Sequence, residues 1–182
     1  VLEEVQGANS VRKIFMDIET DALLDDMTCV HCIAIAINED KPKAYGPDDL
    51  EAGVSEMLNA DMLIGHNIIG FDYPALMKFG RTRLIKNFDA TFRDTLICSR
   101  LLYPDLKEDD WRRMHSPARK EFPKDCYGRH SLKAWGYRLG HHKGKFLEET
   151  QDYGTYTEDM ADYCKRDVEC TRTLYLALEQ GR

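Results

Sequence analysis

Two acidic side chains, one residue apart, end the first apolar run of the chain. They are Asp17 and Glu19, in the segment Ile-Phe-Met-Asp-Ile-Glu-Thr. Residues two positions apart on a β-strand point to the same face, so both carboxylates can reach one ion. Either acid alone fits an ordinary strand end, but a charged pair on one face of an apolar core strand is costly unless a cation compensates it. The pair therefore indicates a cation site.

Two further aspartates lie in contexts that can return them to the same place. Asp72 follows a short apolar run, and loops at the carboxyl ends of strands often carry functional sites. Taken alone, Asp72 fits equally well as a helix N-cap. Asp167 comes four residues after Tyr163 in a predicted helix, hence one turn away on the same face. Without the other acids, this pair also fits a tyrosine on an apolar stripe beside a solvated aspartate.

The four acids matter as an ordered set. Four carboxylates that converge on one pocket repel one another strongly unless divalent cations hold them together. Such an arrangement is typical of the active site of a two-metal phosphodiester-cleaving enzyme. In this arrangement Tyr163 would stand beside a ligand carboxylate, where its phenol can hold a metal-bound water.

The apolar patterns predict the elements that would position these acids. Strands are expected at 13–19, 29–37, 43–45, 62–65 and 88–92, with the first two antiparallel. Helices are expected at 47–59, 73–79, 95–102, 131–139 and 157–179, with caps at Asp94, Ser131 and Thr157 and a stop at Gly140. Residues 103–129 show little periodicity and are expected to form a long surface excursion. The order of elements indicates an α/β fold, a mixed five-stranded sheet flanked by helices.

Length and composition are those of one soluble globular domain. The 182 residues are 43% hydrophobic and 31% charged, and we expect a single domain over 1–182 with a loosely ordered extension at 1–11. No apolar stretch is long enough to cross a membrane, and no signal-peptide pattern is present. The six scattered cysteines predict reduced thiols of a cytoplasmic protein. Cys29 and Cys32 have zinc-like spacing, but they would face opposite sides of a strand and lack a partner pair.

Positive charge is concentrated in one segment of an acidic chain. Residues 112–145 hold ten Lys/Arg and two acids, a charge of +8, which leaves about −15 for the rest of a chain of net charge −7. A basic strip on an acidic body suits an enzyme that holds a phosphate backbone beside a metal-loaded acidic site. An isolated run of this kind would more often be a solvated face, so its meaning depends on the carboxylates.

The ordered motifs Asp-x-Glu, Asn-xxx-Phe-Asp and Tyr-xxx-Asp resemble those of the DEDD 3′→5′ exonuclease superfamily, tyrosine subgroup, which has an RNase H-like (DnaQ-like) fold. The similarity is greatest to the proofreading exonuclease domain of family A DNA polymerases from T-odd podovirus phages. It extends from Arg12 to the end of the chain and includes Asp94-Thr-Leu-Ile-Cys-Ser-Arg-Leu and Ser131-Leu-Lys-Ala-Trp-Gly-Tyr-Arg-Leu-Gly. The histidine subgroup would need a histidine at position 162, where this chain has Asp162.

The resemblance implies a cofactor, a substrate and a set of site residues. Two divalent cations, Mg²⁺ or Mn²⁺, would be held by Asp17, Glu19, Asp72 and Asp167, while Tyr163 orients the attacking water. The substrate would be the 3′ end of single-stranded DNA, released as 5′-mononucleotides, and a DNA polymerase domain or subunit is an implied partner. Leu23 would wedge between the terminal bases, and the remaining substrate contacts would come from Thr20, Asn67, Phe146, Arg129 and Lys133.

Two other functions remain open from the sequence. An exoribonuclease of the same superfamily would use the same acids, because the chemistry does not itself select deoxyribose. A non-catalytic nucleic-acid-binding module on the same fold would be expected to lack one or more of the four acids. No polymerase portion follows, so the domain either is excised or works alone, and the initial Val1 hints at a trimmed chain.

Overall fold

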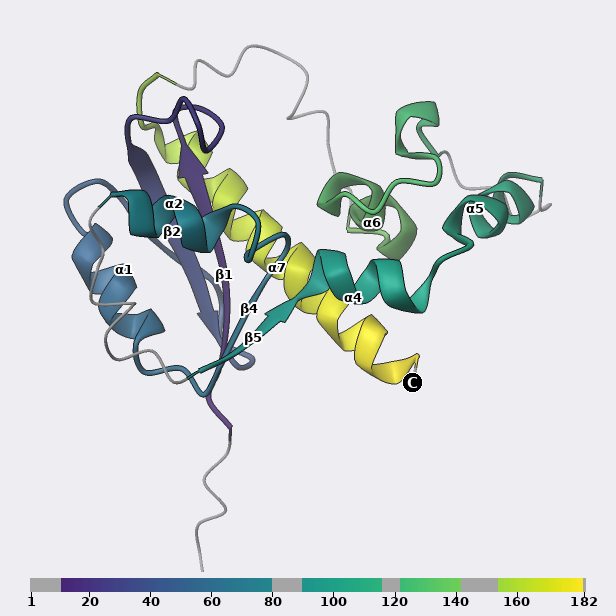
Figure 1. The fold of residues 1–182 in the computed structure, drawn as a ribbon, viewed down its shortest axis with the longest axis horizontal. Helices are drawn as coiled ribbons and strands as arrows, with labels where there is room; N and C mark the ends of the chain where they lie inside the picture. The colour runs from purple at the N-terminus through teal and green to yellow at the C-terminus, as the bar shows by residue number, and fades with distance from the viewer. Residues whose placement is uncertain (1–10, 80–89, 116–121, 142–153, 182) are drawn as a thin grey trace, which may run out of the picture.

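A five-stranded mixed sheet forms the centre of the molecule (Figure 1). The computed structural model describes residues 11–79, 90–115, 122–141 and 154–181. The strands are β1 (Lys13–Thr20), β2 (Val30–Ile37), β3 (Lys43–Tyr45), β4 (Met62–Gly65) and β5 (Thr91–Asp94), in the order β3-β2-β1-β4-β5. β2 is antiparallel to β1 and β3, whereas β4 is parallel to β1 and β5. The predicted mixed five-stranded α/β sheet is confirmed.

Helices cover both faces of this sheet. They are α1 (Leu50–Met57), α2 (Asp72–Lys78), α4 (Thr95–Leu102), α5 (Leu106–Met114), α6 (Leu132–Leu139) and α7 (Glu158–Gln180), with a 3-10 turn at Lys124–Cys126. Figure 1 shows α1 and α2 on one side of the sheet and the long α7 crossing the other. Beyond the sheet, α7 continues to α4 and α6.

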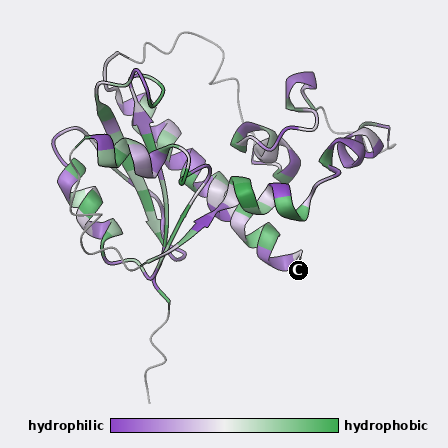
Figure 2. Ribbon diagram, viewed as in Figure 1, coloured by the Kyte–Doolittle hydropathy of each residue, from purple (hydrophilic) through white to green (hydrophobic). Residues whose placement is uncertain are grey.

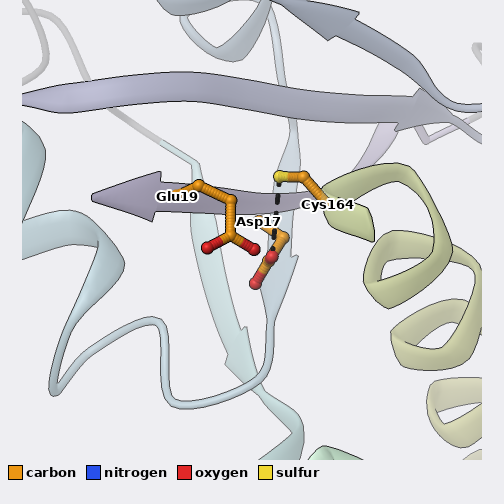
Figure 3. A group of neighbouring side chains, drawn as sticks. All are labelled: Asp17, Glu19 and Cys164. Atoms are coloured by element: carbon orange, nitrogen blue, oxygen red, sulfur yellow. Dashed lines mark hydrogen bonds between the residues drawn. The ribbon is translucent and has the colours of Figure 1, made fainter. Parts of the chain in front are cut away.

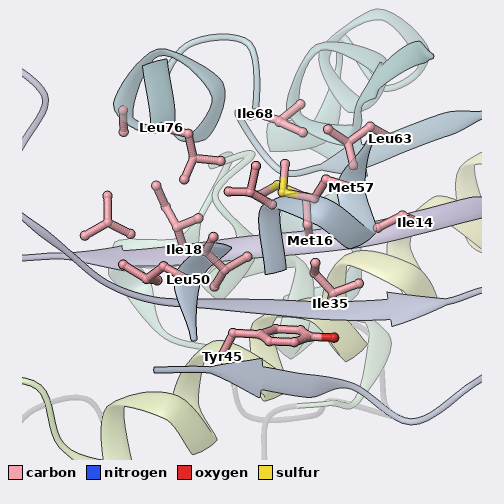
Figure 4. Packing of buried hydrophobic residues seen from close by; sticks show 14 of the residues in the cluster. Ile14, Met16, Ile18, Ile35, Tyr45, Leu50, Met57, Leu63, Ile68 and Leu76 are labelled. Atoms are coloured by element: carbon pink, nitrogen blue, oxygen red, sulfur yellow. The ribbon is translucent and has the colours of Figure 1, made fainter. Parts of the chain in front are cut away.

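The alternation of β1 divides the core into two layers. Ile14, Met16 and Ile18 pack with residues of α1 and α2 in the cluster drawn in Figure 4. Phe15 faces the opposite way and packs with Val168 and other residues of α7. Because side chains alternate along a strand, Asp17 and Glu19 lie on the α7 side of the sheet.

The predicted helix ends are confirmed at three caps. The side chains of Asp94, Ser131 and Thr157 each accept hydrogen bonds from amides in the first turn of α4, α6 and α7. Gly140 ends α6 with φ of 74°, the left-handed conformation that glycine adopts without steric cost.

Three expectations about the elements were wrong. The excursion at 103–129 contains a helix, α5, whose sequence Leu-Lys-Glu-Asp-Asp-Trp-Arg-Arg-Met is too charged to show an apolar period. Its hydrophilic character contrasts with the sheet in Figure 2. β5 runs over Thr91–Asp94 rather than 88–92, of which 88 and 89 lie outside the described residues. The first helix begins at Leu50 and not at Pro47.

In the described part of the chain, no helix combines the length and apolar character needed to cross a bilayer. The expected extension at 1–11 falls outside the described residues except for Val11.

Candidate active site

Asp17 and Glu19 sit at the end of β1 that extends beyond its neighbour β4. β1 pairs with β2 from Ile14 to Thr20, but its register with β4 covers only Lys13 to Phe15. The backbone beyond Phe15 is therefore free on the β4 side to meet another segment. The two carboxylates project from this stretch toward α7, as their spacing predicted.

The segment that meets β1 there is the start of α2, which carries Asp72. It is the first residue of α2, is 3% exposed, and its carboxylate accepts hydrogen bonds from the backbone of Ile18 and from its own amide. The helix N-cap is Phe71, without a side-chain cap hydrogen bond. The N-cap interpretation of Asp72 is thus not the arrangement seen, and the carboxylate reaches β1 between Asp17 and Glu19.

Tyr163 and Asp167 approach from α7. They are one turn apart, and the Tyr163 hydroxyl donates a hydrogen bond to the Asp167 carboxylate. Burial, and then the nearby charge of Asp167, raise the pKa of Tyr163. The phenol therefore remains a hydrogen-bond donor at any ordinary pH.

The four carboxylates form one electrostatic cluster. Burial raises the pKa of Asp17 well above its ordinary value, and the charges of Asp72, Asp167 and Glu19 raise it further. Burial, followed by the charges of Asp167 and Asp72, raises the pKa of Glu19 to about 8. Burial also raises the pKa of Asp72 to about 7 and that of Asp167 to about 6. One buried and three half-buried acids that disfavour one another's charge are the donor set that a hard divalent cation fits.

Cys164 is a member of this site that the sequence reasoning missed. Ligand atoms of Asp17, Glu19 and Cys164 lie within 4.8 Å of one another. Figure 3 shows these three side chains gathered between β1 and α7. The Cys164 thiol donates a hydrogen bond to Asp17 Oδ2 at 3.6 Å. The available signal was helical spacing, because Cys164 lies three residues before Asp167 and so shares its side of α7.

Asp94 also does more than cap α4. Its buried carboxylate accepts hydrogen bonds from the amides of Leu96 at 2.9 Å and Ile97 at 3.3 Å within the helix. It also accepts from the amides of Asn67 at 3.1 Å and Ile69 at 3.2 Å. One side chain therefore fixes the start of α4 and the loop that leads to Asp72.

The predicted substrate-binding residues beside the acids take different positions. The Thr20 hydroxyl donates to the carbonyl of Ala22 at 2.8 Å, and Thr20 is 7% exposed. Leu23 follows β1 and is 76% exposed, an unusual position for a large apolar side chain. Asn67 is exposed with φ of 67°. Phe146 lies outside the described residues.

The basic strip is partly engaged in structural contacts. Arg138 is buried, with a side-chain exposure of 2%, and pairs with Asp110, so it does not belong to an exposed basic surface. Lys133 pairs with Asp125 at 2.9 Å and Arg112 pairs with Asp109 at 2.9 Å. Arg129 is exposed. The proposed strip is therefore less continuous than its sequence suggested.

The fold is shared with solved nuclease structures. The structure resembles that of Brucella melitensis NrnC with bound Mg²⁺, with a TM-score of 0.59 and 18% identity over 94% of this chain and 73% of that chain. This similarity shows the RNase H-like fold of these nucleases. No family model matches the sequence.

Two sequence relatives are DNA polymerases of phages. The chain is 32% identical over 183 residues to the DNA-directed DNA polymerase of Escherichia phage T7, covering 88% of this chain and 26% of the polymerase. It is 33% identical over 180 residues to the DNA-directed DNA polymerase of Enterobacteria phage T3, covering 87% of this chain and 25% of that protein. The chain thus spans about a quarter of the length of these relatives. By fold and by sequence, the chain is similar to DnaQ-like exonucleases and to these phage polymerases.

Proposed function

We propose that the chain is a single-domain, metal-dependent 3′→5′ exonuclease that removes 5′-mononucleotides from the 3′ end of single-stranded DNA. One observation carries the proposal: β1, α2 and α7 bring four carboxylates into a cluster whose charges oppose one another. A protein keeps such a cluster at a cost unless cations occupy it in function. The similarity to phage DNA polymerases supports DNA as the substrate.

Two divalent cations, Mg²⁺ or Mn²⁺, fit this donor set. Asp17, Glu19 and Asp167 would contribute to one ion, and Asp17 and Asp72 would contribute to the other. When bound, such ions lower the pKa of water and neutralise charge on the phosphate that is being cleaved.

Tyr163 would orient the attacking water. Its hydroxyl is already fixed against Asp167 and stays protonated, so it can direct a water molecule toward the scissile phosphate without serving as the base. Its position one turn of α7 away from a ligand carboxylate, on the same face, supports this role.

Substrate would approach over the loops that surround the acids. The exposed Leu23 would insert between the last two bases, and Thr20 and Asn67 would contact the terminal nucleotide. Phe146, Arg129 and Lys133 remain proposed contacts to the incoming strand, Lys133 by exchanging Asp125 for phosphate. A polymerase domain or subunit is the proposed partner that delivers the 3′ end.

The proposed activity and its preference for DNA over RNA are tested together. Purified chain is incubated in Mg²⁺ with 5′-labelled single-stranded DNA and with RNA of the same sequence. A ladder that shortens from the 3′ end, formed faster on DNA, supports the proposal. Faster loss of RNA would make the chain an exoribonuclease with the same acids, and no cleavage of either strand would leave a binding module.

A further inference from the structure

The thiol of Cys164 lies against a carboxylate that the proposed function assigns to both cations. Cys164 Sγ is 3.6 Å from Asp17 Oδ2, and the side chain of Cys164 is 0% exposed. Figure 3 shows the Asp17 carboxylate next to both Cys164 and Glu19. Asp17 therefore has a hydrogen-bond donor fixed against one of its two oxygens.

This contact spans the junction between α7 and β1. Cys164 packs in the cluster that joins α7 to the sheet, together with Val168 and Phe15. The same junction is held farther along by the edge-to-face contact of Phe15 with Tyr175, whose ring centroids are 5.5 Å apart. Cys164 thus connects Asp17 on the strand to the helix that carries Asp167.

A carboxylate that bridges ions must present a defined oxygen to each of them. An Asp side chain in a pocket of other acids is pushed by their charges toward any orientation that lowers repulsion. A donor on one oxygen opposes that rotation, and hydrogen bonds to ligating carboxylates typically support metal affinity in this way. Within the residues that the structure describes, the side-chain hydrogen bond to the Asp17 carboxylate comes from the Cys164 thiol.

We propose that Cys164 is a positioning residue, whose thiol holds the Asp17 carboxylate in the orientation in which it shares a cation with Glu19 and Asp167. The inference rests on the proposed function, because it assumes that these acids bind divalent cations. It differs from a packing role, in which the volume of the side chain alone would matter.

Three variants separate the donor from the packing. Cys164→Ser keeps one donor, Cys164→Val keeps a similar volume without a donor, and Cys170→Ala is the matched control. Cys170 is a buried thiol on the same helix, near Asp167, whose hydrogen bond goes to the carbonyl of Leu132 at 3.8 Å. Calorimetric titration with Mn²⁺ measures the dissociation constant, and urea unfolding in EDTA reports packing.

The two roles predict different orders of the variants. If Cys164 positions Asp17, the Val variant should bind Mn²⁺ about 10-fold or more weakly, within the 10–100-fold range of such partners. The Ser variant and Cys170→Ala should bind close to the wild type. Equal Mn²⁺ affinity of the wild type and the Val variant overturns the inference, as does equal weakening in the Ser and Val variants. A Val variant that does not fold also overturns it, because packing would then be the dominant role.

The test of Cys164 can fail or succeed independently of the test of the proposed exonuclease activity. A wild-type chain that binds Mn²⁺ with the predicted order of variants, yet cleaves no DNA or RNA, would contradict the exonuclease and leave the role of Cys164 standing. A wild type that degrades DNA, together with a Val variant of unchanged Mn²⁺ affinity, would support the exonuclease and contradict the role of Cys164. A wild type that binds no Mn²⁺ overturns both.

Discussion

Asp110 and Arg138 form a two-point ion pair that is almost completely buried. Arg138 donates from Nε to Asp110 Oδ1 at 2.9 Å and from Nη2 to Oδ2 at 2.6 Å, with side-chain exposures of 2% and 1%. Arg138 also donates to the carbonyls of Arg129 and Cys126, and the Gly128 amide donates to Asp110. The pair thus ties α5, the turn at 126–129 and α6 into one unit.

Loss of one partner of this pair should be severely destabilising. Asp110→Asn preserves the shape but leaves the Arg138 guanidinium buried without a countercharge, which typically costs about 3–5 kcal/mol. Urea unfolding followed by circular dichroism measures the difference. The matched control is Arg112→Ala, because Arg112 is 66% exposed in its ion pairs and should change stability by less than about 1 kcal/mol. Equal effects of the two variants would contradict the structural role of Asp110.

Removal of the Asp94 carboxylate should disturb both a helix start and the approach to Asp72. Asp94→Ala deletes an N-cap, worth about 1 kcal/mol, and leaves the amides of Asn67 and Ile69 without their acceptor at roughly 1 kcal/mol each. We expect a loss of roughly 2–4 kcal/mol in urea unfolding. Thr157→Ala is the control, since among the described residues its side chain accepts only from the Met160 amide in the first turn of α7. It should cost about 1 kcal/mol, and a similar value for Asp94→Ala would refute the double role.

Stability without metal should fall as the pH rises from 6.5 to 8.5. The pKa values of Asp72, about 7, and Glu19, about 8, are raised by folding, so the folded chain binds protons that the unfolded chain has already lost. The window begins at 6.5 because half-buried His66 acts in the opposite direction below that pH, its pKa being lowered to about 4. Thermal unfolding in EDTA measures the slope, and Glu19→Gln should flatten it.

Mg²⁺ should reverse that loss. A cation competes with protons for the same carboxylates, so saturating Mg²⁺ should raise the melting temperature more at pH 8.5 than at pH 6.5. An equal shift at both values, or a melting temperature in EDTA that does not depend on pH, would argue against the electrostatic cluster.

Tyr163→Phe should separate catalysis from metal binding. The variant keeps the ring but loses the hydroxyl that contacts Asp167, so kcat should fall on the order of 10²-fold through misplacement of the attacking water. Mn²⁺ affinity should stay near the wild-type value, because the phenol is not a proposed ligand. A kcat within twofold of the wild type would exclude Tyr163 from the reaction, and a large loss of Mn²⁺ affinity would instead make it part of the metal site.

The elements that carry the acids were predictable because their signals are local. The apolar run before Asp17, the turn chemistry before Asp72 and the helical spacing of Tyr163 and Asp167 each depend on a few neighbouring residues. The approach of Asp72 to β1 reflects the parallel pairing of β1 with β4, which the structure shows, whereas Asp167 comes from α7. The family resemblance, confirmed by the phage relatives, supplied their order.

The remaining features depend on contacts between distant segments, which no local pattern reports. α5 is stabilised through Asp110, whose partner Arg138 lies 28 residues further along the chain. Cys164 meets Asp17 across 147 residues, and a buried cysteine in a helix looks like any other core residue in the sequence. The charge of Arg138 was visible, but its burial was not.

Shortening of 5′-labelled single-stranded DNA from its 3′ end tests the central claim most directly. The wild type is compared with Asp167→Asn in Mg²⁺ and in EDTA. Asp159→Asn is the control, an exposed acid on the first turn of the same helix. The account predicts a ladder shortening from the 3′ end for the wild type and the control, abolished by EDTA and reduced at least 10²-fold in Asp167→Asn. Undiminished cleavage by Asp167→Asn, or in EDTA, would contradict catalysis by cations held in the acidic cluster.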